Sequence, residues 1–191
     1  AGAMWREVVG TSAFWASAAK SYLINLVFGV TINVLLHMQQ TYMPFLDGFQ
    51  GDMATAFCSS AFFCGLFTPL FSSFFIHKKV RHGLIKPPDS EAIGRSCWCG
   101  ILRSGACLRS VLLALLDTAI FGTLTVALGG LACSGKKPDV CGLRLWSFLA
   151  ILVVWCIPIQ AATSLLNYVA TTHRSRDVYP TLAPAGVEVC N

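Results

Sequence analysis

Four long stretches of the sequence carry almost no charge, and this feature constrains the fold more than any other. They are residues 21–46, 53–76, 110–135 and 145–172, and each contains at least 24 residues. The one formal charge inside them is Asp117. About 20 predominantly apolar residues are enough for an α-helix to cross the hydrocarbon core of a bilayer. The sequence therefore predicts an all-α integral membrane protein with four transmembrane helices.

The composition excludes several classes of function. Charged residues make up 12% of the 191 residues, against roughly 25% in a typical soluble domain. Little of the chain is left for a soluble catalytic domain. The net charge of +5 comes mainly from segments that flank the stretches, where lysine and arginine set membrane topology. We therefore expect no nucleic-acid partner.

The breaks between the stretches indicate a single domain with four spans. The expected spans are residues 21–43, 53–76, 110–132 and 145–170. Glycine, proline and aspartate mark two short connections, so we expect the helices to pack as two antiparallel hairpins. A polar, basic central loop at residues 77–109 joins the hairpins, and a C-terminal tail follows at residues 173–191.

The distribution of lysine and arginine predicts the orientation. The termini, the central loop and its flanks hold 11 of these residues, and the two short connections hold 3. An excess of lysine and arginine marks the cytoplasmic side of a membrane. We therefore expect the termini and the central loop on the cytoplasmic, stromal or matrix side.

Asp117 is the candidate for an ion or proton site. An ionised aspartate in a span costs roughly 2.5–3.5 kcal/mol on insertion scales, so Asp117 is expected to be neutral, paired or turned toward the protein interior. One interpretation is an intramembrane cation site. The alternative is that Asp117 reaches toward the nearby membrane surface or pairs locally with Arg109, which lies eight residues earlier on the same helix face.

His37 and Gln40 are the candidates for contact with a cofactor. They lie together near the far end of the first span. A single imidazole is a suitable axial ligand for a metal ion such as the magnesium of chlorophyll. Chlorophyll, carotenoid or a structural lipid would therefore fit this position. The alternative is an interfacial histidine that binds water or lipid headgroups.

The nine cysteines do not form a metal-site pattern. There is no C-x-x-C, and Cys97 and Cys99 form only a C-x-C, whereas a structural zinc site normally uses two closely spaced pairs. We expect no metal site. Cys133 and Cys141 fall in the same short connection, and they form a disulfide if that compartment is oxidising.

Three further groups of residues bear on packing. Pro69 and Pro158 lie within spans, where a proline either kinks the helix to open a cavity or is a tolerated bend. Amide side chains that can hydrogen-bond between helices are Asn25, Asn33, Gln160 and Asn167. Glycines that allow close approach of helices are Gly29, Gly65, Gly122 and Gly129.

One segment resembles a known group of proteins. The sequence reads Thr68-Pro69-Leu70, then His77-Lys78-Lys79-Val80-Arg81, then Gly83 and Pro87-Pro88. This resembles a pattern in small, uncharacterised four-helix membrane proteins of bacterial type. The resemblance covers the first half of the chain. It implies the four-span fold and no particular activity.

Together these features predict a non-catalytic accessory subunit of a larger energy-transducing membrane complex, photosynthetic or respiratory. The chain would pack against other membrane subunits and bind lipid or pigment. No nucleophile–base pair is visible, so we expect no enzyme. An organelle membrane is the expected location, with the thylakoid preferred to the mitochondrial inner membrane. The alternative is a small transporter or channel that uses Asp117.

Overall fold

The computed structural model describes residues 2–39, 41–45, 53–82, 85, 98–134 and 141–178. These residues are mostly helical. Four helical segments are long and apolar enough to cross a membrane. This is consistent with the predicted class, an all-α membrane protein, and it confirms the prediction of four helices of spanning length.

The first two spans are α2, Ser12–His37, and α3, Met53–Arg81. The third consists of α6, Ala106–Asp117, the π-helical η1, Thr118–Gly122, and α7, Thr123–Cys133. The fourth is α8, Leu145–Val178. The shorter elements are the helices α1, Gly2–Val9, and α5, Cys99–Arg103, and the strands β1, Tyr42–Pro44, and β2, Gly142–Arg144.

The first span lies closer to the N-terminus than expected. It begins at Ser12, where the hydroxyl of Thr11 accepts a hydrogen bond from the Phe14 amide at 3.3 Å. This is an N-cap, which satisfies a backbone donor that has no partner within the helix. The helix ends at His37, and residues expected at the end of the span form β1 instead. The expected boundary at residue 43 was therefore wrong.

Helices also extend into the expected central loop and tail. α3 continues to Arg81, and α8 continues to Val178. α5 and the start of α6 occupy the end of the expected loop at residues 77–109. Polar side chains at a helix end can reach water beyond the apolar layer, so the loss of hydrophobicity marks the membrane boundary rather than the helix end.

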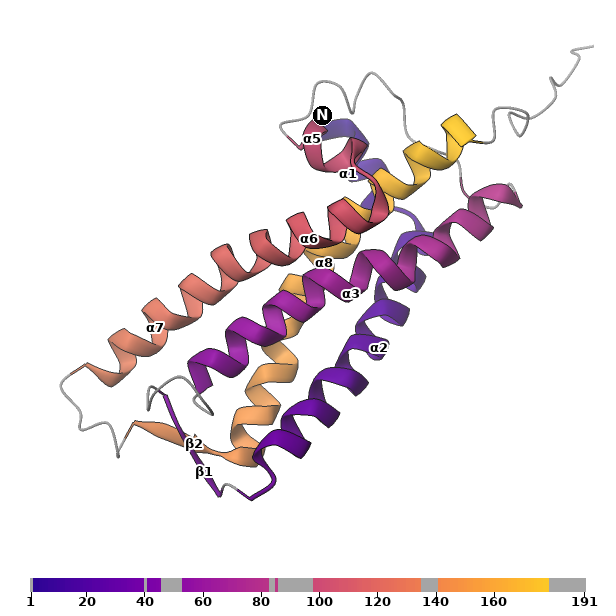
Figure 1. Cartoon of the computed structure of the whole chain (residues 1–191). Helices are drawn as coiled ribbons and strands as arrows, with labels where there is room; N and C mark the ends of the chain where they lie inside the picture. Colours follow the sequence, from indigo (N-terminus) through magenta and orange to yellow (C-terminus); the bar gives the residue numbers. More distant parts are fainter. Residues whose placement is uncertain are drawn as a thin grey trace, which may run out of the picture.

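A small sheet joins the two short connections. β1 pairs antiparallel with β2, with Met43 opposite Leu143. The amide of Phe45 also donates to the Cys141 carbonyl at 2.8 Å. The sheet lies at one end of the bundle (Figure 1), and we call this the sheet end. The apolar cluster there contains Met43, Phe45, Met53, Ala54, Ala56, Phe57, Leu145, Phe148, Leu149 and Leu152.

α3 is the central helix of the bundle. Its most extensive contacts are with α8 and α6, followed by those between α2 and α8 and between α2 and α3 (Figure 1). The contacts between α6 and α8 are fewer, and polar side chains make several of them. A Cβ on Gly65 would lie 2.5 Å from the Cα of Ala114, which places the backbones of α3 and α6 in direct contact.

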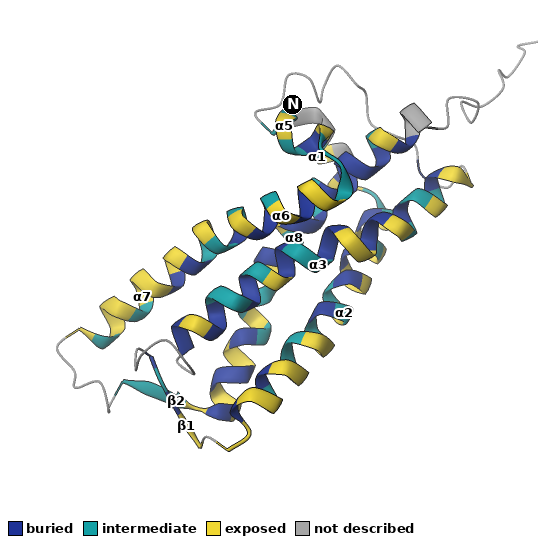
Figure 2. Ribbon diagram, viewed as in Figure 1, coloured by how far each residue is buried: buried dark blue, intermediate teal, exposed yellow. Residues whose placement is uncertain are grey.

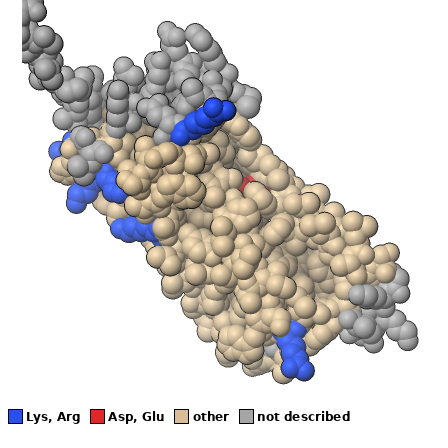
Figure 3. All heavy atoms as spheres, turned by 180° about the vertical axis from the view of Figure 1, so that it is seen from behind, with Lys and Arg blue, Asp and Glu red and all other residues tan. Residues whose placement is uncertain are grey.

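The surface has exposed apolar helix faces and one end where basic side chains are concentrated. Figure 2 shows long exposed faces on α2 and α7, whereas buried residues are more frequent on α3 and on the part of α8 toward the basic end. The exposed faces carry large apolar side chains such as Leu36 and Leu131. Figure 3 shows lysine and arginine gathered toward the end of the molecule opposite the sheet, and we call this the basic end.

Candidate functional site

A stripe of buried polar side chains runs along α8 toward the basic end. Its members are Gln160, Thr163, Ser164, Asn167, Thr171 and Ser175. Their spacing of three or four residues places them on one face of the helix. This face is turned toward α3 and α6. In a membrane, polar groups on a span are satisfied inside the protein because lipid tails offer them no hydrogen bonds.

Arg109 lies at the centre of this network and is only 1% exposed. Its Nε donates to the Asn167 Oδ1 at 2.9 Å. Its Nη2 donates to the Thr171 and Ser73 hydroxyls at 2.9 and 3.3 Å, and its Nη1 donates to the Ser104 carbonyl at 3.0 Å. All four partners are uncharged. Arg109 therefore joins α6 to α3 and α8 inside the bundle.

A second group of polar side chains joins α2 to the same stripe. The Asn25 Nδ2 donates to the Thr68 hydroxyl at 2.8 Å and to the Gln160 Oε1 at 2.6 Å. The Asn167 Nδ2 donates to the Ser72 hydroxyl at 2.5 Å, and Ser72 in turn donates to the Thr68 carbonyl at 2.5 Å. Hydrogen bonds thus connect Asn25 to Arg109 without a break. They fix all four spans relative to one another.

Asp117 is buried at the end of α6 and accepts a hydrogen bond from the Thr163 hydroxyl at 2.5 Å. It does not pair with Arg109, since eight residues of α-helix separate them by about 12 Å along the axis. The local-pair interpretation was therefore wrong. The π-helical η1 begins directly after Asp117, and such turns are frequent at functional sites. An ion site at Asp117 stays a prediction.

A large cavity opens between α2, α3 and α8 on the side of the bundle toward the sheet end. Its volume is about 710 Å³. Polar side chains in its wall are Tyr22, Asn25, Asn33, His37, Thr55, Ser59, Ser60, Cys64 and Cys156. Apolar side chains line the rest, among them Leu26, Phe28, Phe63 and Phe67. Neither Pro69 nor Pro158 lines this cavity.

The structure places one of the two candidate cofactor residues in this wall. His37 is buried at the end of α2 and lines the cavity. Gln40 lies outside the described residues. Of the four amides, Asn25, Gln160 and Asn167 bond between helices, whereas Asn33 donates to the Gly29 carbonyl of its own helix at 2.8 Å.

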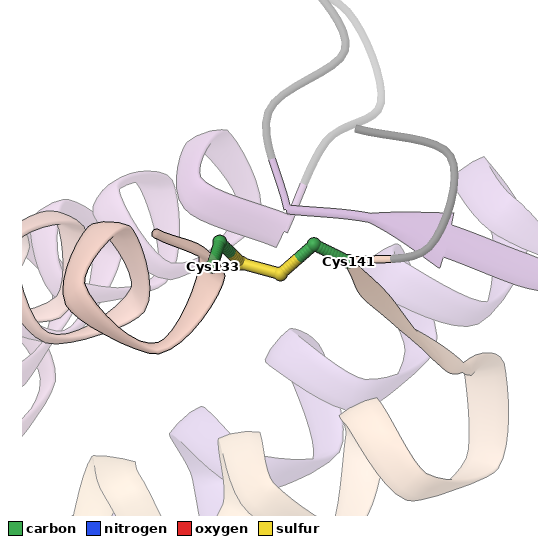
Figure 4. The surroundings of a disulfide bond; sticks show 2 residues. All are labelled: Cys133 and Cys141. Atoms are coloured by element: carbon green, nitrogen blue, oxygen red, sulfur yellow. A yellow bond between two sulfur atoms is a disulfide. The ribbon is translucent and has the colours of Figure 1, made fainter. Parts of the chain in front are cut away.

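Cys133 and Cys141 form a disulfide, with their Cα atoms 5.6 Å apart (Figure 4). It ties the end of α7 to the residue that directly precedes β2. Cys97 lies outside the described residues. Among the residues that are described, no group of three or more histidine, cysteine, aspartate or glutamate side chains is placed to hold a metal ion.

Sequence reasoning missed the role of Arg109. It counted Arg109 as one of the cations that flank the central loop, but the side chain points into the bundle. A signal was present in the sequence. Arg109, Leu113 and Asp117 share one helix face, and the polar residues of α8 recur at helical spacing. Such a pattern indicates an internal polar face in a span.

Comparisons with known proteins give no indication of the function of this chain. No protein-family model, no curated protein and no solved structure matches this chain.

Proposed function

We propose that this chain is a non-catalytic subunit of a larger membrane assembly, and that it binds one amphiphilic molecule, a lipid or a pigment, between α2, α3 and α8. The cavity in that place carries the proposal. Its volume of about 710 Å³ lies within the roughly 300–1,000 Å³ typical of ligand pockets. Its wall combines aromatic and aliphatic side chains with a few polar groups, as such pockets usually do.

The chemistry of the wall supports an amphiphile. The phenylalanines Phe28, Phe63 and Phe67 offer contact for a hydrocarbon chain or a ring system. Toward the sheet end, the wall also contains the polar side chains of His37 and Thr55, which already have interactions within the protein. A molecule with an apolar body and a polar group would match both parts of the wall.

The organisation of the polar network supports a structural rather than a catalytic role. Arg109 and Asn167 bond to each other and to neighbouring side chains of the bundle. The exposed apolar faces of α2 and α7 support packing against partner helices or lipid.

The orientation belongs to the same proposal. Two antiparallel hairpins would be joined by the basic central loop at residues 77–109, with this loop and both termini on the cytoplasmic, stromal or matrix side. The gathering of lysine and arginine at the basic end supports this (Figure 3). Membership of a photosynthetic or respiratory complex, an organelle membrane, and chlorophyll or carotenoid as the ligand stay predictions.

A variant that fills the cavity tests the proposal. Gly29 lines the cavity, and a Cβ added there meets nothing within 4 Å. Gly29→Phe should therefore fold and occupy the binding volume. Gly130→Phe is the matched control, because Gly130 is exposed on α7 and is equally unobstructed.

The measurement is native mass spectrometry of each protein extracted from its own membrane. We expect an amphiphile bound to the wild type and to Gly130→Phe, and its loss from Gly29→Phe. Retention of the amphiphile by Gly29→Phe would contradict binding in this cavity. A native gel of the same extract tests the subunit role, which fails if the chain runs alone and is stable without partners.

A small transporter or channel is the second candidate, and the position of Asp117 favours it. Asp117 is buried, accepts a hydrogen bond from Thr163 and precedes the π-helical η1. Proton flux into liposomes, followed with a pH-sensitive dye, separates the two candidates. Flux through the wild type that Asp117→Asn abolishes would favour transport, and equal traces for both proteins and empty liposomes would exclude it.

A further inference from the structure

A second, smaller cavity lies at the basic end, between α2 and α3. Its volume is about 230 Å³. Four basic side chains line it, namely Lys20 from α2, Lys78 and Lys79 from the end of α3, and His82 directly after α3. No aspartate or glutamate is among the described residues that line it. The positive charge of its wall is therefore not neutralised from within.

The depth of the cavity matches the boundary of the apolar layer. Lys20 directly precedes the uncharged stretch that begins at residue 21, and Lys78 follows shortly after the stretch that ends at residue 76. Lysine side chains at such positions extend their ammonium groups to the headgroup region. Both helices thus place cations at the same level.

The wall changes character along the helix axis. Phe71, Phe75, Lys79 and His82 follow one another at intervals of three or four residues, so they share one face of α3. The two phenylalanines lie on the membrane side and the basic residues on the surface side. The Lys20 Nζ lies 3.8 Å from the centroid of the Phe75 ring, a cation–π contact that holds the ammonium group where the apolar and basic parts meet.

We propose that this cavity binds the headgroup of an anionic phospholipid from the leaflet at the basic end. The phosphate would lie among Lys20, Lys78 and Lys79, and the start of an acyl chain would lie against Phe71 and Phe75. Basic pockets between transmembrane helices bind anionic lipid headgroups in this manner. The two-part wall favours a lipid over a free phosphate, because a free phosphate gains nothing from the phenylalanines.

The test uses the purified full chain in a neutral detergent. Native mass spectrometry measures the binding of phosphatidylglycerol and of phosphatidylcholine with identical acyl chains. Replacement of Lys20, Lys78 and Lys79 by glutamine removes three charges from the cavity. Replacement of Arg6, Arg103 and Arg174 by glutamine removes three charges from the same end outside it.

We expect the cavity variant to bind phosphatidylglycerol about tenfold or more weakly, since each lysine near a membrane surface contributes noticeably to anionic lipid binding. The control should change by less than about threefold because its charges act only at a distance. Equal losses in both variants would show diffuse attraction and overturn the site. Equal binding of phosphatidylcholine by the wild type would also overturn it.

Two further measurements isolate the site. Ala16→Trp places a large side chain at an exposed position in the cavity wall without changing the charge. This variant should weaken phosphatidylglycerol binding as the lysine variant does. Unchanged binding would contradict the site. Inorganic phosphate should compete poorly, and competition as strong as that of the lipid would identify a free-phosphate site instead. Gly29→Phe, which fills the large cavity, should leave this binding intact.

Discussion

The two halves of α8 differ sharply, although both present a buried face to α3. Buried residues in the half toward the sheet end are Leu145, Phe148, Leu149 and Leu152. Those in the half toward the basic end include Gln160, Ser164, Asn167 and Thr171. The first half is stabilised mainly by apolar packing, whereas the second adds a network of hydrogen bonds to an apolar cluster that includes Tyr168, Val169 and Ala170. A buried face in a membrane can therefore be apolar or polar, because lipid tails are as apolar as the side chains they meet and do not by themselves drive apolar groups inward.

The two halves also fix their neighbours by different means. Around the apolar half, the sheet and the Cys133–Cys141 disulfide hold the connections together. Around the polar half, Arg109 and Asn25 bring three other helices to α8. Hydrogen bonds have defined directions. The polar half of α8 should therefore set the register of the helices, whereas the sheet and the disulfide beside the apolar half hold the ends of the helices together.

The largest expected effect is the loss of Arg109. Arg109→Ala should lower the free energy of unfolding by about 3 kcal/mol or more, because buried acceptors lose their donor and a large side chain leaves a void. Thermal unfolding in detergent measures the effect. Arg103→Ala removes an exposed arginine nearby and should change stability by less than about 0.5 kcal/mol. Similar results for both variants would refute the central role of the network.

A close contact between α3 and α6 at Gly65 lies at the level where the two halves of α8 meet. Gly65→Ala should lower stability by about 2–3 kcal/mol, because the new Cβ overlaps the backbone of Ala114 and neither helix can yield cheaply. Gly29→Ala meets nothing within 4 Å and should be neutral or stabilising by up to about 1 kcal/mol. Melting temperatures of the two variants that coincide would show that the helices are not in close contact.

Loss of the disulfide beside the apolar half should lower the free energy of unfolding by less than the loss of Arg109 does. Replacement of both Cys133 and Cys141 by serine should lower stability by about 2.5 kcal/mol, as the chain-entropy relation gives for a loop of this length. Unfolding with and without reductant checks the value in the wild type. The effect should add to that of Arg109→Ala, since distant sites act independently. A strong departure from additivity would show that the two halves are coupled.

The smallest effect is expected at Thr163. Thr163→Val removes the donor to Asp117, and single hydrogen bonds between transmembrane helices contribute about 0.6–1.7 kcal/mol. Denaturant unfolding in detergent resolves a change of this size. Thr31→Val, at an exposed position of α2, is the control. If Thr163→Val lowered the free energy of unfolding much more than Arg109→Ala does, Asp117 rather than Arg109 would be the central residue of the network.

Much of the fold was accessible from sequence, and the candidate sites only in part. The span count was confirmed because apolar length is a local property, and the disulfide lies where the cysteine spacing indicates one. The predicted end of the first span, at residue 43, was wrong because residues 42–44 form a strand whose partners lie about a hundred residues further along the chain. His37 was named as a candidate, but nothing local showed that Phe63 and Cys156 would share its cavity.

The sequence by itself predicted four helices that are long and apolar enough to cross a membrane, and it predicted that the cations gather on one side. Both follow from composition along the chain. The tertiary structure alone decided which polar groups meet. Arg103 and Arg109 look alike in the sequence, yet one is exposed and the other is buried among side chains of α3 and α8. Burial depends on which helices pack together, and that depends on contacts between residues far apart in the chain.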